Sequence, residues 1–167
     1  MVANTGTYLD TPSHRFEGKP DLALLPLDAL ANLEGVVLRP AVAGRAVTAA
    51  ALGAVDVRGK AVLVQTGWDR HFGTPAYAQG HPFLTRDAAE RLRDGGAALV
   101  GIDSLNIDDT ADGARPVHTV LLAAGILVIE HMTNLAALPP AGFRFFAVPP
   151  RVRGMGTFPV RAFALVL

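Results

Sequence analysis

The chain has no cysteine among its 167 residues and no excess of charge of either sign. Without cysteine, disulfides, thiolate metal sites and cysteine nucleophiles are all excluded. The 15 basic residues balance the 15 acidic residues, so nothing in the composition indicates binding to nucleic acid or to an anionic membrane. A near-neutral surface also has little self-repulsion, which makes self-association easy.

The chain also lacks the segments that are typical of secretion and of membrane insertion. Its first residues contain neither a basic region nor an apolar one, so no signal peptide is indicated. The longest apolar run, residues 120–129, is too short to cross a bilayer. Because these absences and the lack of cysteine fit the cytoplasm, we expect a cytoplasmic protein with neither nucleic-acid nor membrane partners.

Hydrophobic residues are abundant in the chain and are spread along its whole length. Half of its residues are hydrophobic and 18% are charged, which is the composition of a globular protein. No linker, repeat or low-complexity segment divides it, so we expect one domain over residues 1–167. Short apolar runs between glycines and prolines predict strands that are covered on both faces. The predicted strands are residues 36–38, 61–66, 98–102, 126–129, 144–148 and 160–167.

One helix is well marked in the sequence. Thr85 is a suitable N-cap, Asp87 follows in the first turn, and Gly95 and Gly96 supply the stop. Shorter helices are predicted within residues 22–33 and 117–124. The alternation of strands and helices predicts an α/β fold with mostly buried strands and flanking helices. In such folds functional residues gather at the carboxyl ends of the strands.

Four polar residues form the candidate site. Asp10, His118 and Glu130 offer one imidazole and two carboxylates, which suit Zn²⁺ or Mn²⁺ and leave positions for water. A bound divalent ion lowers the pKa of its water and polarises a carbonyl. His14 could then act as the general base or acid. Their spacing leaves other roles open, namely a turn cap for Asp10, a surface carboxylate for Glu130 and a core or helix-start histidine for His118.

Other polar and aromatic residues allow weaker interpretations. Trp68 follows a glycine at a strand end and could line an aromatic pocket, or it could lie in the core or at an interface. We expect His71 and His81 to be exposed loop histidines. His131 should point away from Glu130, because neighbours in a strand face opposite ways. An acidic stretch lacks the glycine and terminal glutamate of a calcium loop, so we interpret it as a solvated turn: Asp103, Asn106, Asp108 and Asp109.

The segment from Asn4 to His14 reads Asn-x-Gly-Thr-Tyr-x-Asp-x-Pro-x-His. It resembles the first motif of the metal-dependent cyclase/hydrolase family that includes bacterial kynurenine formamidase, His-x-Gly-Thr-His-x-Asp-x-Pro-x-His. The similarity continues in order as far as Leu138. Its later stretches are Thr66-Gly67-Trp68-Asp69, His81-Pro82, Gly101-Ile102-Asp103, His118-x-x-Leu121-Leu122, and Ile129-Glu130 followed by Asn134-Leu135.

This resemblance implies a swivelling β/β/α fold, a homodimer or homotetramer, and an arylformamidase-like hydrolase of C–N bonds in tryptophan catabolism. The family binds one metal through the two histidines and the aspartate of the first motif. A second metal shares that aspartate and adds the histidine of His-x-x-Leu-Leu and the glutamate of a later strand. The second set is complete here, whereas Asn4 and Tyr8 replace the two histidines of the first set. The resemblance therefore implies one metal ion per chain, with His14 in the place of the catalytic histidine.

The substitutions leave three functions open. The first is hydrolysis of a small amide, ester or cyclic amide, in which Tyr8 could donate a hydrogen bond to the oxyanion while Asn4 and Trp68 contact the substrate. The second is a metal-free pseudoenzyme that binds a small ligand. The third is a non-hydrolytic enzyme, for dehydration or cyclisation, in which Tyr8 and His14 form an acid–base pair. Family members usually carry some tens of residues before the first motif, so we also expect a native N-terminal section upstream of this chain.

Overall fold

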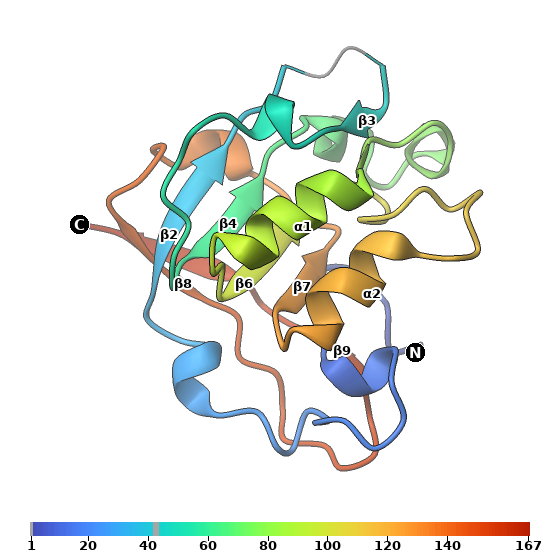
Figure 1. Ribbon diagram of the computed structural model, residues 1–167, viewed down its shortest axis with the longest axis vertical. Helices are drawn as coiled ribbons and strands as arrows, with labels where there is room; N and C mark the ends of the chain where they lie inside the picture. Colours follow the sequence, from blue (N-terminus) through green and yellow to red (C-terminus); the bar gives the residue numbers. More distant parts are fainter. Residues whose placement is uncertain (1, 42–43) are drawn as a thin grey trace.

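Four parallel strands form the centre of an eight-stranded mixed sheet (Figure 1). The computed structural model describes residues 2–41 and 44–167. The central strands, in their order across the sheet, are β2 (Leu33–Leu38), β4 (Ala61–Val64), β6 (Leu99–Ile102) and β7 (Leu127–Glu130). All four agree with predicted strands, because continuous apolar runs are favoured where a strand is buried on both faces.

Antiparallel strands extend this centre on both sides. Beyond β7 lie β1 (Tyr8–Asp10) and β9 (Thr157–Pro159), and beyond β2 lie β8 (Phe143–Phe146) and β10 (Phe163–Val166). A separate pair of parallel strands consists of β3 (Ala46–Val47) and β5 (Phe83–Leu84). The pairing of β1 with β7 sets Tyr8 opposite Glu130 and Asp10 opposite Val128. It therefore brings the start of the chain to the end of a central strand.

Helices α1 (Arg86–Asp94) and α2 (Pro116–Ala123) lie together on one face of the sheet (Figure 1). Side chains along β4 alternate between two buried clusters, with Val62 and Val64 packed among the helix residues and Leu63 on the opposite face. This is the period of two that a strand imposes. Full burial of a side chain such as Leu63 contributes roughly 1.5–3 kcal/mol to folding. The two clusters hold the sheet, and with it the carboxyl ends of its strands, in place.

Short 3₁₀ helices provide most of the remaining regular structure. They are η1 (Pro12–His14), η2 (Leu27–Ala29), η3 (Ala50–Leu52), η4 (Trp68–His71), η5 (Pro75–Ala78) and η6 (Leu135–Ala137). The helix predicted after Pro26, within residues 22–33, is the single 3₁₀ turn η2, which Pro26 precedes. No helix in the described ranges is long and apolar enough to cross a membrane.

The marked helix begins and ends where the sequence predicts. It starts after Thr85, and Gly96 follows its end with a positive φ of 77° that favours glycine. Thr85 does not cap it through its side chain, since its hydroxyl donates to the carbonyl of Val47 instead. The predicted helix within residues 117–124 is α2. The strands β1, β3, β5 and β9 were not predicted, because runs of two or three residues are too short to show a periodicity.

Candidate metal centre

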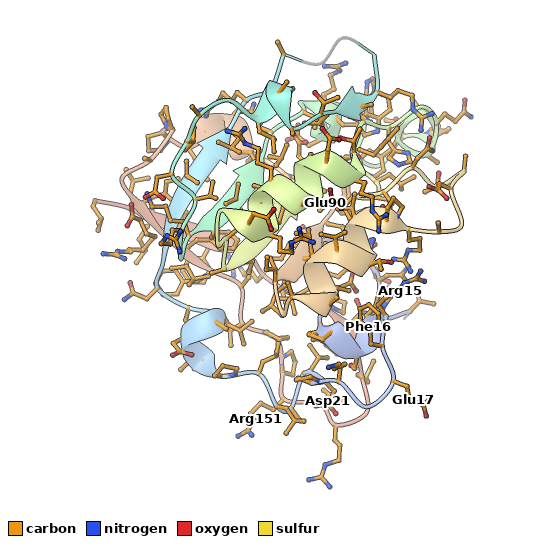
Figure 2. The ribbon with its side chains drawn as sticks, viewed as in Figure 1. Arg15, Phe16, Glu17, Asp21, Glu90 and Arg151 are labelled. Carbon is orange, nitrogen blue, oxygen red and sulfur yellow. The ribbon has the colours of Figure 1, made fainter. Side chains whose placement is uncertain are left out.

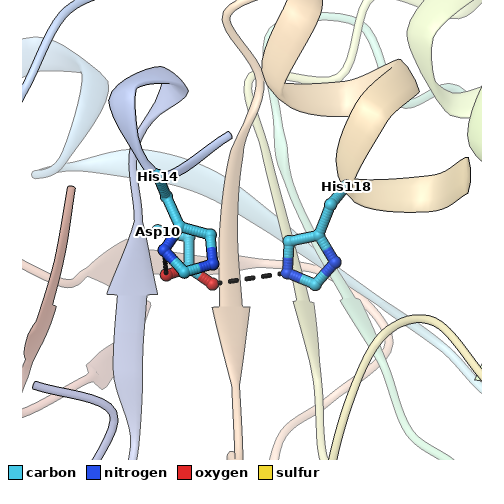
Figure 3. A group of neighbouring side chains, drawn as sticks. All are labelled: Asp10, His14 and His118. Carbon is cyan, nitrogen blue, oxygen red and sulfur yellow. Dashed lines mark ion pairs between the residues drawn. The ribbon is translucent and has the colours of Figure 1, made fainter. Parts of the chain in front are cut away.

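Three side chains from distant parts of the chain converge beside the sheet (Figure 3). Asp10 ends β1, His14 ends the 3₁₀ turn that follows it, and His118 lies in α2. The Oδ2 atom of Asp10 lies 3.4 Å from Nε2 of His118, and its Oδ1 atom lies 3.5 Å from Nδ1 of His14. One ligand atom from each residue lies within 4.8 Å of the others. This spacing is compatible with one shared ion.

The polar atoms at the centre of this group lack partners. Both carboxylate oxygens of Asp10 and Nε2 of His118 are buried, and none has a hydrogen-bond partner among the described residues. Asp10 and His118 are each 0% exposed. Buried polar atoms without partners are uncommon, and each one costs about 1–3 kcal/mol. Two carboxylate oxygens and an imidazole nitrogen are suitable ligands for Zn²⁺ or Mn²⁺, so the residues present fit a divalent ion.

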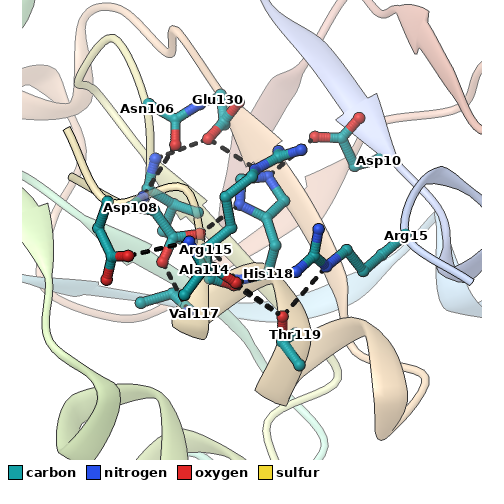
Figure 4. A network of polar contacts seen from close by, with 12 residues as sticks. Asp10, Arg15, Asn106, Asp108, Ala114, Arg115, Val117, His118, Thr119 and Glu130 are labelled. Carbon is teal, nitrogen blue, oxygen red and sulfur yellow. Dashed lines mark hydrogen bonds and ion pairs between the residues drawn. The ribbon is translucent and has the colours of Figure 1, made fainter. Parts of the chain in front are cut away.

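Asp108 orients His118 from the side away from Asp10 (Figure 4). Its Oδ2 atom lies 2.6 Å from Nδ1 of His118, and its carboxylate also accepts from the backbone N–H groups of Val117 and His118. Burial alone would raise the pKa of Asp108, but these hydrogen bonds outweigh it and lower the pKa. Such a carboxylate fixes the imidazole orientation and leaves Nε2 for a metal.

The surrounding charges keep His118 protonated when no metal is bound. Burial opposes the charged form of His118, but Asp10, Asp108 and Glu130 outweigh this and raise its pKa to about 9. Metal ligation requires the neutral imidazole, so binding at His118 would release that proton.

Glu130 lies next to the three-residue group and is already hydrogen-bonded. Its Oε1 atom accepts from the backbone N–H of Ile107 at 2.6 Å and lies 3.6 Å from Nε2 of His118. Its Oε2 atom accepts from the hydroxyl of Tyr8, with the Asn106 amide 3.4 Å away. Burial raises the pKa of Glu130, and together with the charge of Glu130 it raises the pKa of Tyr8 far above its usual range. Tyr8 is thus a neutral phenol whose single hydrogen is committed to Glu130.

His14 faces the group from its more open side. Its side chain is 26% exposed, and its ring centroid lies 5.8 Å from that of His118. Nε2 of His14 lies 3.2 Å from Nη2 of Arg115, a donor-only group, so this nitrogen is the acceptor. Burial lowers the pKa of His14 and Arg115 lowers it further, although Asp10 opposes them. Arg115 was not identified from the sequence, because no local pattern distinguishes it.

The two substrate-contact candidates have different surroundings. Asn4 lies exposed in a turn ahead of β1. Trp68 is partly buried in η4, where its indole N–H donates to the carbonyl of Tyr77 and its ring lies 4.6 Å from that of His71. Among the described residues, neither makes a hydrogen bond to Asp10, His14 or His118.

Two histidine predictions are corrected by the structure. His81 is not an exposed loop residue, since it is 1% exposed and its Nε2 lies 3.1 Å from the carbonyl oxygen of Asp108. It is buried because the following residues form β5, which pairs within the second sheet. His131 does not point away from the site, because β7 ends at Glu130 and His131 has a φ of 56°. Its ring lies 5.2 Å from that of Tyr8.

The solvated turn predicted in the acidic stretch is wrong for two of its members. Asp103 is 0% exposed and accepts hydrogen bonds from the backbone N–H groups of Thr66 and Gly67 and from the Thr66 hydroxyl. Asp108 is 1% exposed. Their partners lie about ten or more positions away in sequence, so the local pattern could not reveal them. Asp109 does lie near the surface, paired with Arg45 at 2.9 Å.

The buried Asp and His group lies where functional residues of α/β sheets gather, at the ends of the strands. Residues 1–109 match the family described as "Putative cyclase", and the chain belongs to this family. Kynurenine formamidase of Paracidovorax citrulli (strain AAC00-1) is 30% identical over 174 residues, which cover 97% of this chain and 76% of that protein. These similarities support a hydrolase of the cyclase family.

Solved structures confirm the fold class. A protein described as a potential metal-dependent hydrolase with cyclase activity superposes with a TM-score of 0.85 at 28% identity, covering 97% of this chain and 78% of that one. Isatin hydrolase A from Ralstonia solanacearum gives 0.84 at 25% identity, covering 97% and 72%. The α/β cyclase-like fold implied by the resemblance is therefore correct.

Proposed function

We propose that this chain is a metal-dependent, arylformamidase-like hydrolase of a small amide, ester or cyclic amide. The observation that carries the proposal is the set of buried, unpartnered atoms on Asp10 and His118. An ion between them would satisfy all three atoms at once. The names of the relatives, kynurenine formamidase and isatin hydrolase, support hydrolysis as the reaction class.

In this proposal Asp10, His118 and Glu130 hold the ion. A bound divalent ion would lower the pKa of a coordinated water and polarise the substrate carbonyl. His118 is held in a fixed orientation by Asp108, and Glu130 is held by Tyr8 and the backbone of Ile107. Ligands oriented in this way lose little freedom when they bind a metal.

His14 moves the proton in the proposed reaction. Its ring spans the distance between the buried Asp10 carboxylate and the partly exposed side of the site. Nε2 of His14 is the nitrogen that would accept the proton, in exchange for its hydrogen bond from Arg115, while Nδ1 stays directed at Asp10. Tyr8 has one hydrogen, and Glu130 accepts it, which disfavours both an oxyanion role and an acid–base role for Tyr8. Trp68 and Asn4 remain proposed substrate contacts.

Elemental analysis of protein purified without chelators, combined with hydrolysis assays on small amides and esters, tests the proposal. We expect about one divalent ion per chain, which is the number that one Asp–His–Glu site can hold. His14→Ala should retain the ion and the fold but lose hydrolysis, whereas Asp10→Asn should lose both the ion and hydrolysis. Unchanged turnover in His14→Ala would remove this mechanism. Absence of metal together with ligand-dependent stabilisation would instead indicate a binding module, and absence of metal together with turnover would indicate a non-hydrolytic enzyme.

A further inference from the structure

Arg115 brings a positive charge to the group formed by Asp10, His14 and His118. It directly precedes α2, and its Nη2 atom lies 3.2 Å from Nε2 of His14. Within residues 2–41 and 44–167 this is the only hydrogen bond that its side chain makes. A guanidinium has five N–H donors. Most of its hydrogen-bonding capacity is therefore available to a ligand.

The backbone of Arg115 is held in an uncommon conformation that directs this side chain. Its φ of 47° and ψ of 59° lie in the left-handed region, which residues other than glycine seldom adopt. Pro116 disfavours the helical alternative for the residue before it. The carbonyl of Arg115 accepts from the N–H of Thr119 at 3.0 Å and from its hydroxyl at 2.8 Å. Strain of this kind concentrates at functional sites, and Figure 4 shows the side chain reaching from the start of α2 towards His118.

We propose that Arg115 binds the carboxylate of the acid that hydrolysis releases, an inference that rests on the proposed function. In that reaction water adds to the acyl carbon, the bond from this carbon to nitrogen or oxygen breaks, and the leaving amine or alcohol takes a proton. The acid that remains is a carboxylate at neutral pH. A guanidinium matches the two oxygens of a carboxylate with two parallel N–H donors.

The charges around the site explain why such a product needs a cation. Asp10, Asp108 and Glu130 surround His118, and one divalent ion would offset only two of their three negative charges, so a fourth carboxylate would still be repelled. Arg15 is close by at the edge of α2 (Figure 2), but its Nε and Nη2 atoms already donate to Thr119 and to the carbonyl of Ala114. The hydrogen bonds of Arg15 go to α2 and to a residue ahead of it, whereas the one side-chain hydrogen bond of Arg115 among the described residues goes to His14 of the candidate site.

The test compares benzoate with benzamide, a neutral molecule of nearly the same shape, as ligands of the metal-loaded protein. Apparent dissociation constants are obtained from thermal stabilisation over a concentration series. Arg115→Met should weaken benzoate binding by about tenfold or more, because it removes hydrogen bonds between a charged donor and a charged acceptor. Benzamide binding should change by less than about twofold, because it lacks the charge. Arg115→Lys should show an intermediate loss, since a lysine cannot form two parallel bonds.

Arg15→Met is the matched control, because it removes a neighbouring cation that hydrogen-bonds to Thr119 and Ala114 rather than to His14. It should leave the preference for benzoate unchanged. An equal loss in Arg15→Met would overturn the proposal in favour of general electrostatic attraction. An unchanged benzoate preference in Arg115→Met would also overturn it.

Metal content and the melting temperature without ligand show whether each variant is intact. If Arg115→Met does not fold, Arg115→Lys decides, and benzoate binding as tight as in the wild type would refute the proposed bidentate contact. The result also separates this inference from the proposed function. Arg115-dependent benzoate binding without hydrolysis would keep the anion site and reject the hydrolase. If the protein hydrolyses its substrate and Arg115→Met does not change inhibition by the product, the hydrolase is kept and the anion site at Arg115 is rejected.

Discussion

Asp108 accepts a hydrogen bond from His118 at 2.6 Å, across a separation of ten positions in the sequence. The same carboxylate accepts hydrogen bonds from the backbone N–H groups of Val117 and His118. These groups lie in the first turn of α2, where N–H groups have no partner within the helix. One buried side chain thus holds the start of the helix and fixes the ring that the helix carries. As a consequence, Nε2 of His118 faces Asp10.

Replacing Asp108 with asparagine should weaken metal binding. Asparagine keeps an acceptor for the backbone of α2 but removes the charge that supports the imidazole. Loss of such an outer carboxylate typically lowers metal affinity by roughly 10–100-fold. Titration calorimetry with Zn²⁺ or Mn²⁺ measures the change, with Asp109→Asn, at the adjacent position, as the control. Equal affinities in the two variants would show that Asp108 only caps the helix.

Metal binding should raise the thermal stability of this protein through Asp10. An ion present at about one hundred times its dissociation constant adds roughly 2.7 kcal/mol. For a chain of this size that corresponds to an increase of about 5–10 °C in Tm. Chelator treatment should reverse the increase, and Asp10→Asn should not show it. A scanning-fluorimetry series that gives the same shift for the wild type and for Asp10→Asn would place the ion elsewhere.

Tyr8→Phe should destabilise the protein without abolishing hydrolysis. The change leaves Oε2 of Glu130 with only the Asn106 amide, 3.4 Å away. A buried acceptor that loses its donor costs about 1–3 kcal/mol, which urea unfolding can resolve. Complete loss of turnover, with the metal still bound and the fold intact, would contradict this expectation. That outcome would assign Tyr8 a direct chemical role.

Gly156→Ala should disturb the site through the backbone of His14. A Cβ atom added at Gly156 would lie 2.5 Å from the backbone nitrogen of His14 and 2.7 Å from its Cα. Overpacking against a backbone costs about 1–3 kcal/mol, and here it would displace the 3₁₀ turn that carries His14. We expect lower stability and slower hydrolysis. Gly113→Ala serves as the control, because no heavy atom lies within 4 Å of its added Cβ, and it should have neither effect.

The central sheet could be predicted from the sequence because its strands are continuous apolar runs. Val62, Leu63 and Val64 are all 0% exposed, so neither face of β4 requires a polar residue. The marked helix could be predicted for a different reason, since Gly95 and Gly96 interrupt its pattern. Of the outer strands, β8 and β10 were also predicted, whereas β1 and β9 were not, because each has only three residues and shows no periodicity.

Part of the candidate site could also be predicted from the sequence. Asp10, His118 and Glu130 were selected from their chemistry and a resemblance, and the structure places the acceptor atoms of Asp10 and Glu130 within 3.6 Å of His118 Nε2. Asp108 was wrongly predicted to be solvated, because its hydrogen-bond partner His118 lies ten positions later, in α2. Arg115 was missed entirely.

The sequence by itself determined the α/β class and the central strands, because these depend on local apolar runs, and it indicated the candidate ligands through side-chain chemistry together with a family resemblance. Only the tertiary structure decided how those ligands are supported. The pairing of β1 with β7 set Tyr8 against Glu130, and the approach of α2 to the 103–108 segment set Asp108 against His118. Long-range packing chooses which polar groups are buried together, and no local pattern encodes that choice.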